Sequence, residues 1–158
     1  MRIFTFSKHG FDTFLQSKGT TRDNVEEKKN VFFISINDSP ETTPEVPYLE
    51  NTDNVKVLTF DDVEQDTTSY KRGLHYKAMS PEQALELVQF IHQHLDKKLC
   101  LIHCSAGVAR SGAVATFIHQ IVDSNKDQFQ EDNPFILPNP YVLNLLQQAN
   151  QQFHSGWG

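Results

Sequence analysis

The chain has 158 residues, of which 38% are apolar and 22% are charged, and this length is typical of one domain that we expect to span residues 1–158. With 14 basic and 20 acidic residues the formal net charge is −6, which disfavours partners such as nucleic acid or an anionic membrane surface. Two cysteines, no membrane-spanning apolar run and no apolar leader after Met1 lead us to expect a cytoplasmic protein without a disulfide framework.

Apolar runs rich in β-branched and aromatic residues predict strands that are buried on both faces. These runs lie at residues 2–6, 31–36, 55–60 and 99–103. Between the first two runs, apolar residues at helical spacing from Phe11 to Leu15 predict a helix that ends near Gly19. A second helix is expected from Ser80 to residue 95, because Ser80, Pro81 and Gln83 form a capping pattern.

Two more helices are expected after the last strand. Residues 111–122 are nearly all apolar, which indicates a central helix, and Asn139 with Pro140 marks the start of a final one. Since strands alternate with helices, the predicted fold class is α/β, a single domain with a mainly parallel sheet flanked by helices.

Three segments are interpreted as solvated connections. Residues 37–54 hold three prolines and five acidic residues against no basic one, which indicates a long surface loop. Residues 61–79 are interpreted as a loop in which Lys71 and Arg72 face solvent, and residues 123–138 as a polar connection.

The segment His103-Cys-Ser-Ala-Gly-Val-Ala-Arg-Ser111 carries most of the chemical information. It lies between a buried strand and a buried helix, where open parallel sheets bind ligands. Small residues and one glycine allow the main chain to turn its amides around a tetrahedral dianion, next to the partial positive charge of the helix start. The planar guanidinium group of Arg110 can donate hydrogen bonds to two phosphate oxygens at once. The residues of this candidate phosphate-binding loop are Ser105, Ala106, Gly107, Val108, Ala109 and Arg110.

Cys104 lies at the floor of this loop. Inward amides, the helix start and Arg110 all favour the thiolate, which is the nucleophilic form of cysteine. The field that holds a phosphate would therefore also prepare a nucleophile. Cys100, by contrast, lies inside the strand, and we interpret it as part of the core.

With these residues in place, the chain resembles the cysteine-dependent protein tyrosine phosphatases. The segment from Cys104 to Arg110 matches their Cys-X5-Arg signature, and the flanking positions of its extended form are filled by His103, Gly107 and Ser111. The short chain and the helix start at Pro138-Asn139 are similar to the compact dual-specificity class. The resemblance covers residues 31–150.

This resemblance implies a two-step phosphoryl transfer, without cofactor or metal, on phosphorylated protein. Cys104 would attack phosphorus and form a phosphocysteine while Arg110 and the loop amides hold the phosphate oxygens. Ser111 would ease the departure of the sulfur, and His103 would hold the loop in shape. Phosphotyrosine is the expected substrate, with phosphoserine and phosphothreonine as further candidates.

The resemblance also implies a carboxylic acid that protonates the leaving oxygen and comes from another loop. The strand end at residues 60–66 offers four carboxylates. We choose Asp62, two residues after Phe60, as the best match to the position in the family, and keep Asp61 and Asp66 as alternatives.

Two other functions stay open. A phosphoinositide or RNA 5′-phosphatase belongs to the same chemical family, although the loop holds no basic residue besides Arg110 and the net charge disfavours polyanions. The second alternative is a phosphate-binding module without catalysis. Such modules usually lose the nucleophile or the arginine, and this chain keeps both.

Overall fold

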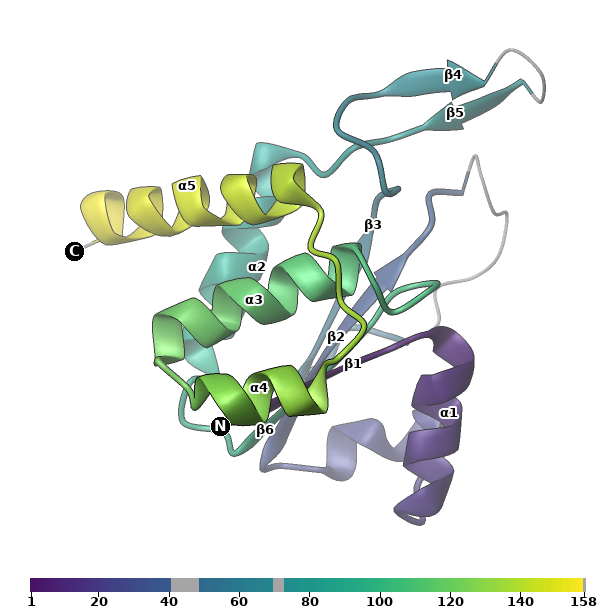
Figure 1. The fold of residues 1–158 in the computed structure, drawn as a ribbon, viewed down its shortest axis with the longest axis vertical. Helices are drawn as coiled ribbons and strands as arrows, with labels where there is room; N and C mark the ends of the chain where they lie inside the picture. Colours follow the sequence, from purple (N-terminus) through teal and green to yellow (C-terminus); the bar gives the residue numbers. More distant parts are fainter. Residues whose placement is uncertain (41–48, 70–72, 158) are drawn as a thin grey trace.

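Four parallel strands form the central sheet in the order β1-β6-β2-β3 (Figure 1). Their bounds in this computed structural model, which describes residues 1–40, 49–69 and 73–157, are Arg2–Phe6 for β1, Val31–Asn37 for β2, Val55–Thr59 for β3 and Leu99–His103 for β6. All four expected strands are present, and the predicted α/β class with a mainly parallel sheet is confirmed.

Helices cover both faces of this sheet (Figure 1). One face carries α2 (Pro81–Gln93), α3 (Arg110–Val122), α4 (Lys126–Asp132) and α5 (Pro140–Trp157). The other face carries α1 (Lys8–Ser17) and the 3-10 helix η1 (Arg22–Glu27). The capping pattern predicted for α2 is confirmed, since Ser80 and Gln83 exchange side-chain to main-chain hydrogen bonds.

Successive residues of the central strands alternate between the two layers. In β2, Phe32 and Ile34 join the core below α2 and α3, whereas Phe33 packs with Phe11 of α1. Cys100 lies in the larger core, as predicted, and burial raises the pKa of its thiol well above the ordinary value. This thiol is therefore held in its unreactive protonated form.

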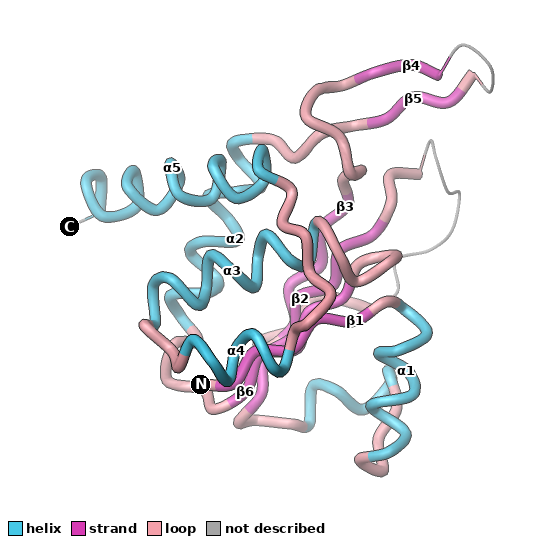
Figure 2. Tube along the Cα trace, viewed as in Figure 1, coloured by secondary structure: helices cyan, strands magenta, loops and turns pink. Residues whose placement is uncertain are grey.

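Two of the expected connections contain regular structure, so these predictions were wrong. Residues 61–79 include an antiparallel hairpin of β4 (Thr67–Ser69) and β5 (Leu74–Tyr76), which projects beyond the main sheet (Figure 2). Residues 123–138 include α4, which Asn125 caps by accepting a hydrogen bond from the amide of Gln128. Lys71, Arg72 and residues 41–48 of the acidic segment lie outside the described residues. In the described part of the chain, no helix combines the length and apolarity needed to cross a membrane.

Candidate active site

The carboxyl ends of the four parallel strands meet at one edge of the sheet, and three of them are followed directly by a polar or chemically active residue. Ser7 follows β1, Asp38 follows β2 and Cys104 follows β6. Since β6 lies between β1 and β2, the residues that follow these two strands flank Cys104. The expected phosphate loop therefore starts at the middle of the site, where ligands bind in this class of sheet.

The loop turns back on its own sulfur. Cys104 Sγ accepts a hydrogen bond from the main-chain N–H of Gly107 over 3.2 Å, and lies 3.2 Å from Ser111 Oγ. Both Cys104 and Ser111 are buried. Helix α3 begins at Arg110, so its partial positive charge is directed at the loop. The structure thus brings the sulfur, a main-chain donor and a hydroxyl group together.

Gly107 allows the loop to pack against the junction of β1 and α1. Its φ is 74°, and a Cβ atom added there would lie 2.5 Å from the main-chain atoms Phe6 C and Ser7 N. The amide of Cys104 also donates to the carbonyl of Phe6 over 3.2 Å. Only glycine combines this conformation with so close an approach of two backbones.

Arg110 is buried and is held at two points of its guanidinium group. Nη1 donates to the carbonyl oxygen of Phe60 over 2.7 Å, and Nη2 forms an ion pair with Asp38 Oδ1 over 2.8 Å. The other carboxylate oxygen of Asp38 accepts a hydrogen bond from Ser105 Oγ over 3.0 Å. Asp38 therefore joins the two ends of the phosphate loop.

His103 lies behind the loop, on the α1 side of the sheet. Its Nε2 lies 2.6 Å from Ser35 Oγ, and the ring lies against Phe11 with centroids 5.3 Å apart. Burial lowers the pKa of His103 to about 4, although a hydrogen bond with the main chain of Cys104 acts in the opposite direction. The imidazole is therefore neutral at pH 7 and suits a structural role beside Cys104.

Two of the three candidate acids are bound to main-chain amides. Asp61 is buried, and its oxygens accept from the amides of Ser39 over 3.0 Å and Lys77 over 2.8 Å. The exposed Asp66 accepts from the amide of Ala78 over 2.9 Å. Asp61 thereby connects the end of β2 to the segment after β5.

Asp62 differs from both because its bound partner is a side chain. Its Oδ1 accepts a hydrogen bond from Asn139 Nδ2 over 2.7 Å, and the residue is exposed. Asn139 caps α5 with its Oδ1 and donates its main-chain N–H to the carbonyl of Ala109 over 3.0 Å. One residue therefore connects Asp62 to the phosphate loop.

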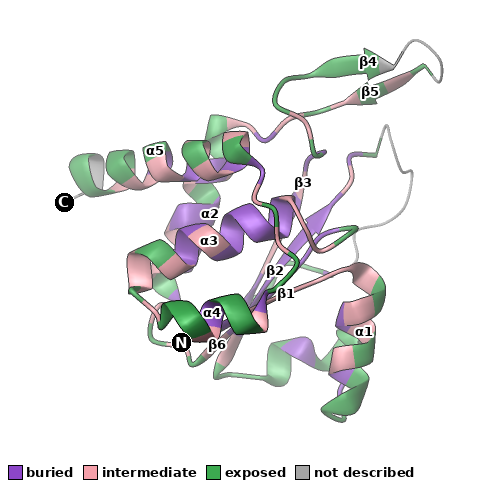
Figure 3. Ribbon diagram, in the orientation of Figure 1, coloured by how far each residue is buried: buried purple, intermediate pink, exposed green. Residues whose placement is uncertain are grey.

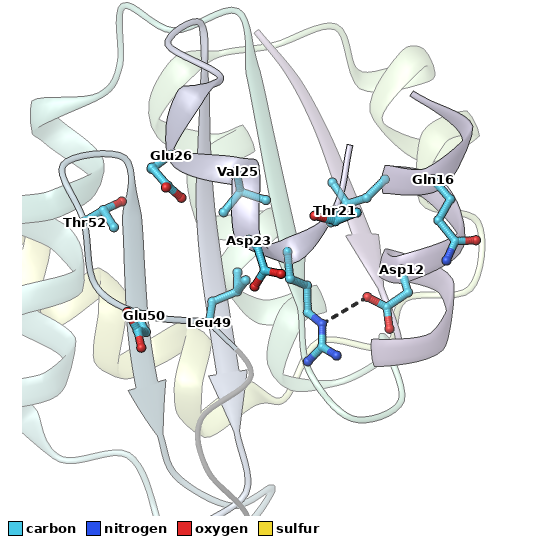
Figure 4. A pocket seen from close by; sticks show the side chains of 11 residues that line it. Asp12, Gln16, Thr21, Asp23, Val25, Glu26, Leu49, Glu50 and Thr52 are labelled. Carbon is cyan, nitrogen blue, oxygen red and sulfur yellow. Dashed lines mark ion pairs between the residues drawn. The ribbon is translucent and has the colours of Figure 1, made fainter. Parts of the chain in front are cut away.

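A cavity of about 600 Å³ lies elsewhere, between α1, η1 and the residues before β3 (Figure 4). The ion pair between Arg22 and Asp12, 3.4 Å long, lies among its lining side chains. Its lining contains none of the residues 103–111. This cavity is therefore separate from the candidate phosphate site.

A family model described as "Tyrosine phosphatase family" matches residues 19–156. The chain belongs to this family. The expected membership of the cysteine-dependent tyrosine phosphatases is thereby confirmed.

Solved structures agree with this tyrosine phosphatase assignment at the level of the fold. Human DUSP28 shares 15% identity with a TM-score of 0.53, over 98% of this chain and 94% of that protein. The PTP-2 phosphatase of Cydia pomonella shares 20% identity with a TM-score of 0.52, over 94% of this chain and 85% of that protein. No curated protein gives a significant match.

Two contacts of this tyrosine phosphatase were not predicted from its sequence, namely that of Asp38 with Arg110 and that of Ser35 with His103. Asp38 was placed in a solvated loop, and Ser35 was counted only as part of a strand. A signal for Asp38 was available, because it follows a buried strand whose carboxyl end lies at the same edge as the loop. For Ser35, a polar residue within the apolar run 31–36 was the available sign of a buried partner.

Proposed function

We propose that this member of the tyrosine phosphatase family hydrolyses phosphate monoesters of proteins, on phosphotyrosine and also on phosphoserine and phosphothreonine, through a phosphocysteine. The observation that carries the proposal is the surrounding of Cys104 Sγ, which contacts the Gly107 amide and Ser111 Oγ at the start of α3. Main-chain donors and a helix start stabilise a thiolate and, with Arg110, a bound dianion.

In the first step, the thiolate of Cys104 attacks phosphorus in line with the leaving oxygen. The S–P bond forms as the P–O bond breaks, and the leaving oxygen takes the proton of Asp62. Arg110 and the loop amides hold the other three phosphate oxygens in both the ground state and the transition state.

In the second step, a water molecule attacks the phosphocysteine and gives its proton to the carboxylate of Asp62. The S–P bond breaks, and the electron pair returns to Cys104 as thiolate. The hydroxyl group of Ser111, 3.2 Å from the sulfur, donates a hydrogen bond to this leaving thiolate. Inorganic phosphate then leaves the loop.

The contacts of the three candidate acids support the choice of Asp62. Both oxygens of the buried Asp61 accept main-chain hydrogen bonds, which favour its ionised form and occupy the atoms that would carry a proton. Asp62 is exposed and connected to the loop through Asn139. An acid that exchanges its proton with leaving group and water needs such access.

The test is hydrolysis of a small aryl phosphate by the purified full chain, with product release followed over time. We expect turnover that vanadate inhibits and that Cys104→Ser abolishes. Binding of a phosphotyrosine peptide without a burst or turnover would instead support a phosphate-binding module. A panel of phosphotyrosine, phosphothreonine, phosphoinositide and triphosphorylated RNA substrates then separates protein phosphatase activity from the two related activities.

A further inference from the structure

The connection between α4 and α5, residues 133–139, is attached to the phosphate loop by two main-chain hydrogen bonds. The amide of Leu137 donates to the carbonyl of Val108 over 3.1 Å, and that of Asn139 donates to the carbonyl of Ala109 over 3.0 Å. We call residues 133–139 the rim segment. Its position beside the candidate site is therefore fixed by the main chain.

Within the rim segment, the partly buried Ile136 lies between two exposed neighbours. Ile136 packs on the main core, and a Cβ atom added to Gly112 of α3 would lie only 3.0 Å from its Cβ. The neighbours on either side, Phe135 and Leu137, are 82% and 73% exposed. Figure 3 shows exposed residues along this connection, in front of the buried helix α3.

These two side chains are the large apolar groups that the described part of the chain leaves exposed. Apolar groups held in water at a fixed position are typical of binding surfaces. Leu137 itself donates its main-chain amide to Val108 of the phosphate loop, and Phe135 lies two residues before it, so both side chains start close to the loop. The ligand most naturally in contact with both is the substrate itself.

We propose that Phe135 and Leu137 form an apolar rim that selects phosphopeptides with a bulky apolar residue within two positions of the phosphorylated one. In an extended peptide, residues two positions apart are separated by about 7 Å, so such a side chain can reach the rim while the phosphate occupies the loop. This inference rests on the proposed function and names the substrates of the same site.

Charge favours a peptide over a membrane as the partner of the rim. Residues 133–139 are uncharged, and the one basic residue of the loop, Arg110, is buried and paired with Asp38. Binding to anionic lipid depends on clusters of exposed Lys and Arg, and the chain carries a net charge of −6. The uncharged rim segment instead suits a neutral apolar side chain that flanks the phosphorylated residue.

The test compares kcat/KM for two phosphotyrosine peptides that differ in one flanking residue, Leu or Ser, each divided by kcat/KM for a small aryl phosphate. We expect the full wild-type chain to prefer the Leu peptide about tenfold, the effect of burying part of one large apolar side chain. Leu137→Ser and Phe135→Ser should each reduce this preference to below threefold, whereas Leu137→Met keeps it. Gln148→Ser, at an exposed position of α5, is the matched control.

The outcomes separate the two proposals. No turnover of the aryl phosphate would mean that the proposed function fails. Turnover with equal preference in wild type and both serine variants would overturn the rim alone. The rim would also be overturned if the two serine variants lost activity on phosphoinositide vesicles but kept it on peptides. The same holds if sedimentation shows a dimer that Leu137→Ser dissociates without a change in peptide preference.

Discussion

The side-chain amide of Asn139 donates a hydrogen bond to Asp62 over 2.7 Å, while its oxygen caps α5 by accepting from the amides of Tyr141 and Val142. The main-chain N–H of Asn139 is bound to Ala109 in the phosphate loop. The proposed acid, a helix start and the loop are therefore connected through one residue. Removal of the Asn139 side chain therefore tests whether the position of Asp62 matters for proton transfer.

Asn139→Ala should lower kcat/KM about tenfold for aryl phosphates with poor leaving groups and much less for those with good ones. The reason is that a general acid contributes only where the leaving oxygen needs a proton. The measurement is the dependence of kcat/KM on the pKa of the leaving phenol, which should become steeper in the variant.

The control is a variant that loses a helix cap but keeps the contact between Asn139 and Asp62. Removal of an N-cap costs about 1 kcal/mol of unfolding free energy. Asn125→Ala removes the matched cap of α4, where the side chain accepts from the amide of Gln128. A similar change of leaving-group dependence in Asn125→Ala would show that capping, and not the contact with Asp62, is responsible.

Substitution of the two neighbouring aspartates should separate catalysis from stability. Asp62→Asn should lower kcat by about 10² to 10⁴, the usual contribution of a general acid. Asp61→Asn should change kcat little, but its new amide group faces a main-chain donor and should cost about 1–3 kcal/mol of unfolding free energy. Turnover and urea unfolding of both variants check this, and equal losses of kcat would contradict the assignment.

The ion pair between Asp38 and Arg110 should matter for orientation of the guanidinium group. Asp38→Ala removes the partner of Nη2 and of Ser105, so we expect kcat/KM for an aryl phosphate to fall about tenfold through loss of a preorganised donor. Asp38→Asn keeps an acceptor oxygen and should retain more activity. A rise of kcat/KM in either variant would mean that Asp38 competes with the phosphate for Arg110.

The sequence was sufficient for the parts of the fold that depend on local pattern. Each central strand is a short run rich in apolar residues, and α2 begins at a capping box, so both could be predicted from neighbouring residues. The hairpin of β4 and β5 was missed because its strands are three residues long, although Thr67 and Thr68 before Gly73 are a recognisable hairpin signal.

The contacts of the site were harder to predict because they join distant parts of the chain. The loop from Cys104 to Ser111 is contiguous, so its composition and signature could be interpreted directly. The pairing of Arg110 with Asp38 depends on which strand lies beside β6, and the sequence gives the strands but not their order. The contact between Asp62 and Asn139 likewise requires the position of α5 relative to β3.

Gly107→Ala should inactivate the enzyme and destabilise the fold. The added Cβ would lie 2.5 Å from main-chain atoms of Phe6 and Ser7, at a φ of 74°. We expect a loss of about 2–4 kcal/mol in unfolding free energy. Gly19→Ala is the matched control, since its φ is 70° with nothing within 4 Å, and it should cost only about 1 kcal/mol. Equal costs would show that close packing at Gly107 contributes nothing.

His103 should make the fold sensitive to mild acid. Burial lowers its pKa to about 4 from the ordinary 6.5, so between these pH values the unfolded chain binds a proton that the folded chain does not. The stability that this difference contributes is fully present above pH 6.5 and is lost as the pH falls toward 4. From pH 7.5 to pH 5 the loss should be about 2 kcal/mol.

Urea unfolding of wild type and His103→Gln at both pH values measures this loss, and the variant should lose about 2 kcal/mol less than wild type. Parallel losses in the two proteins would show that other groups cause the acid sensitivity.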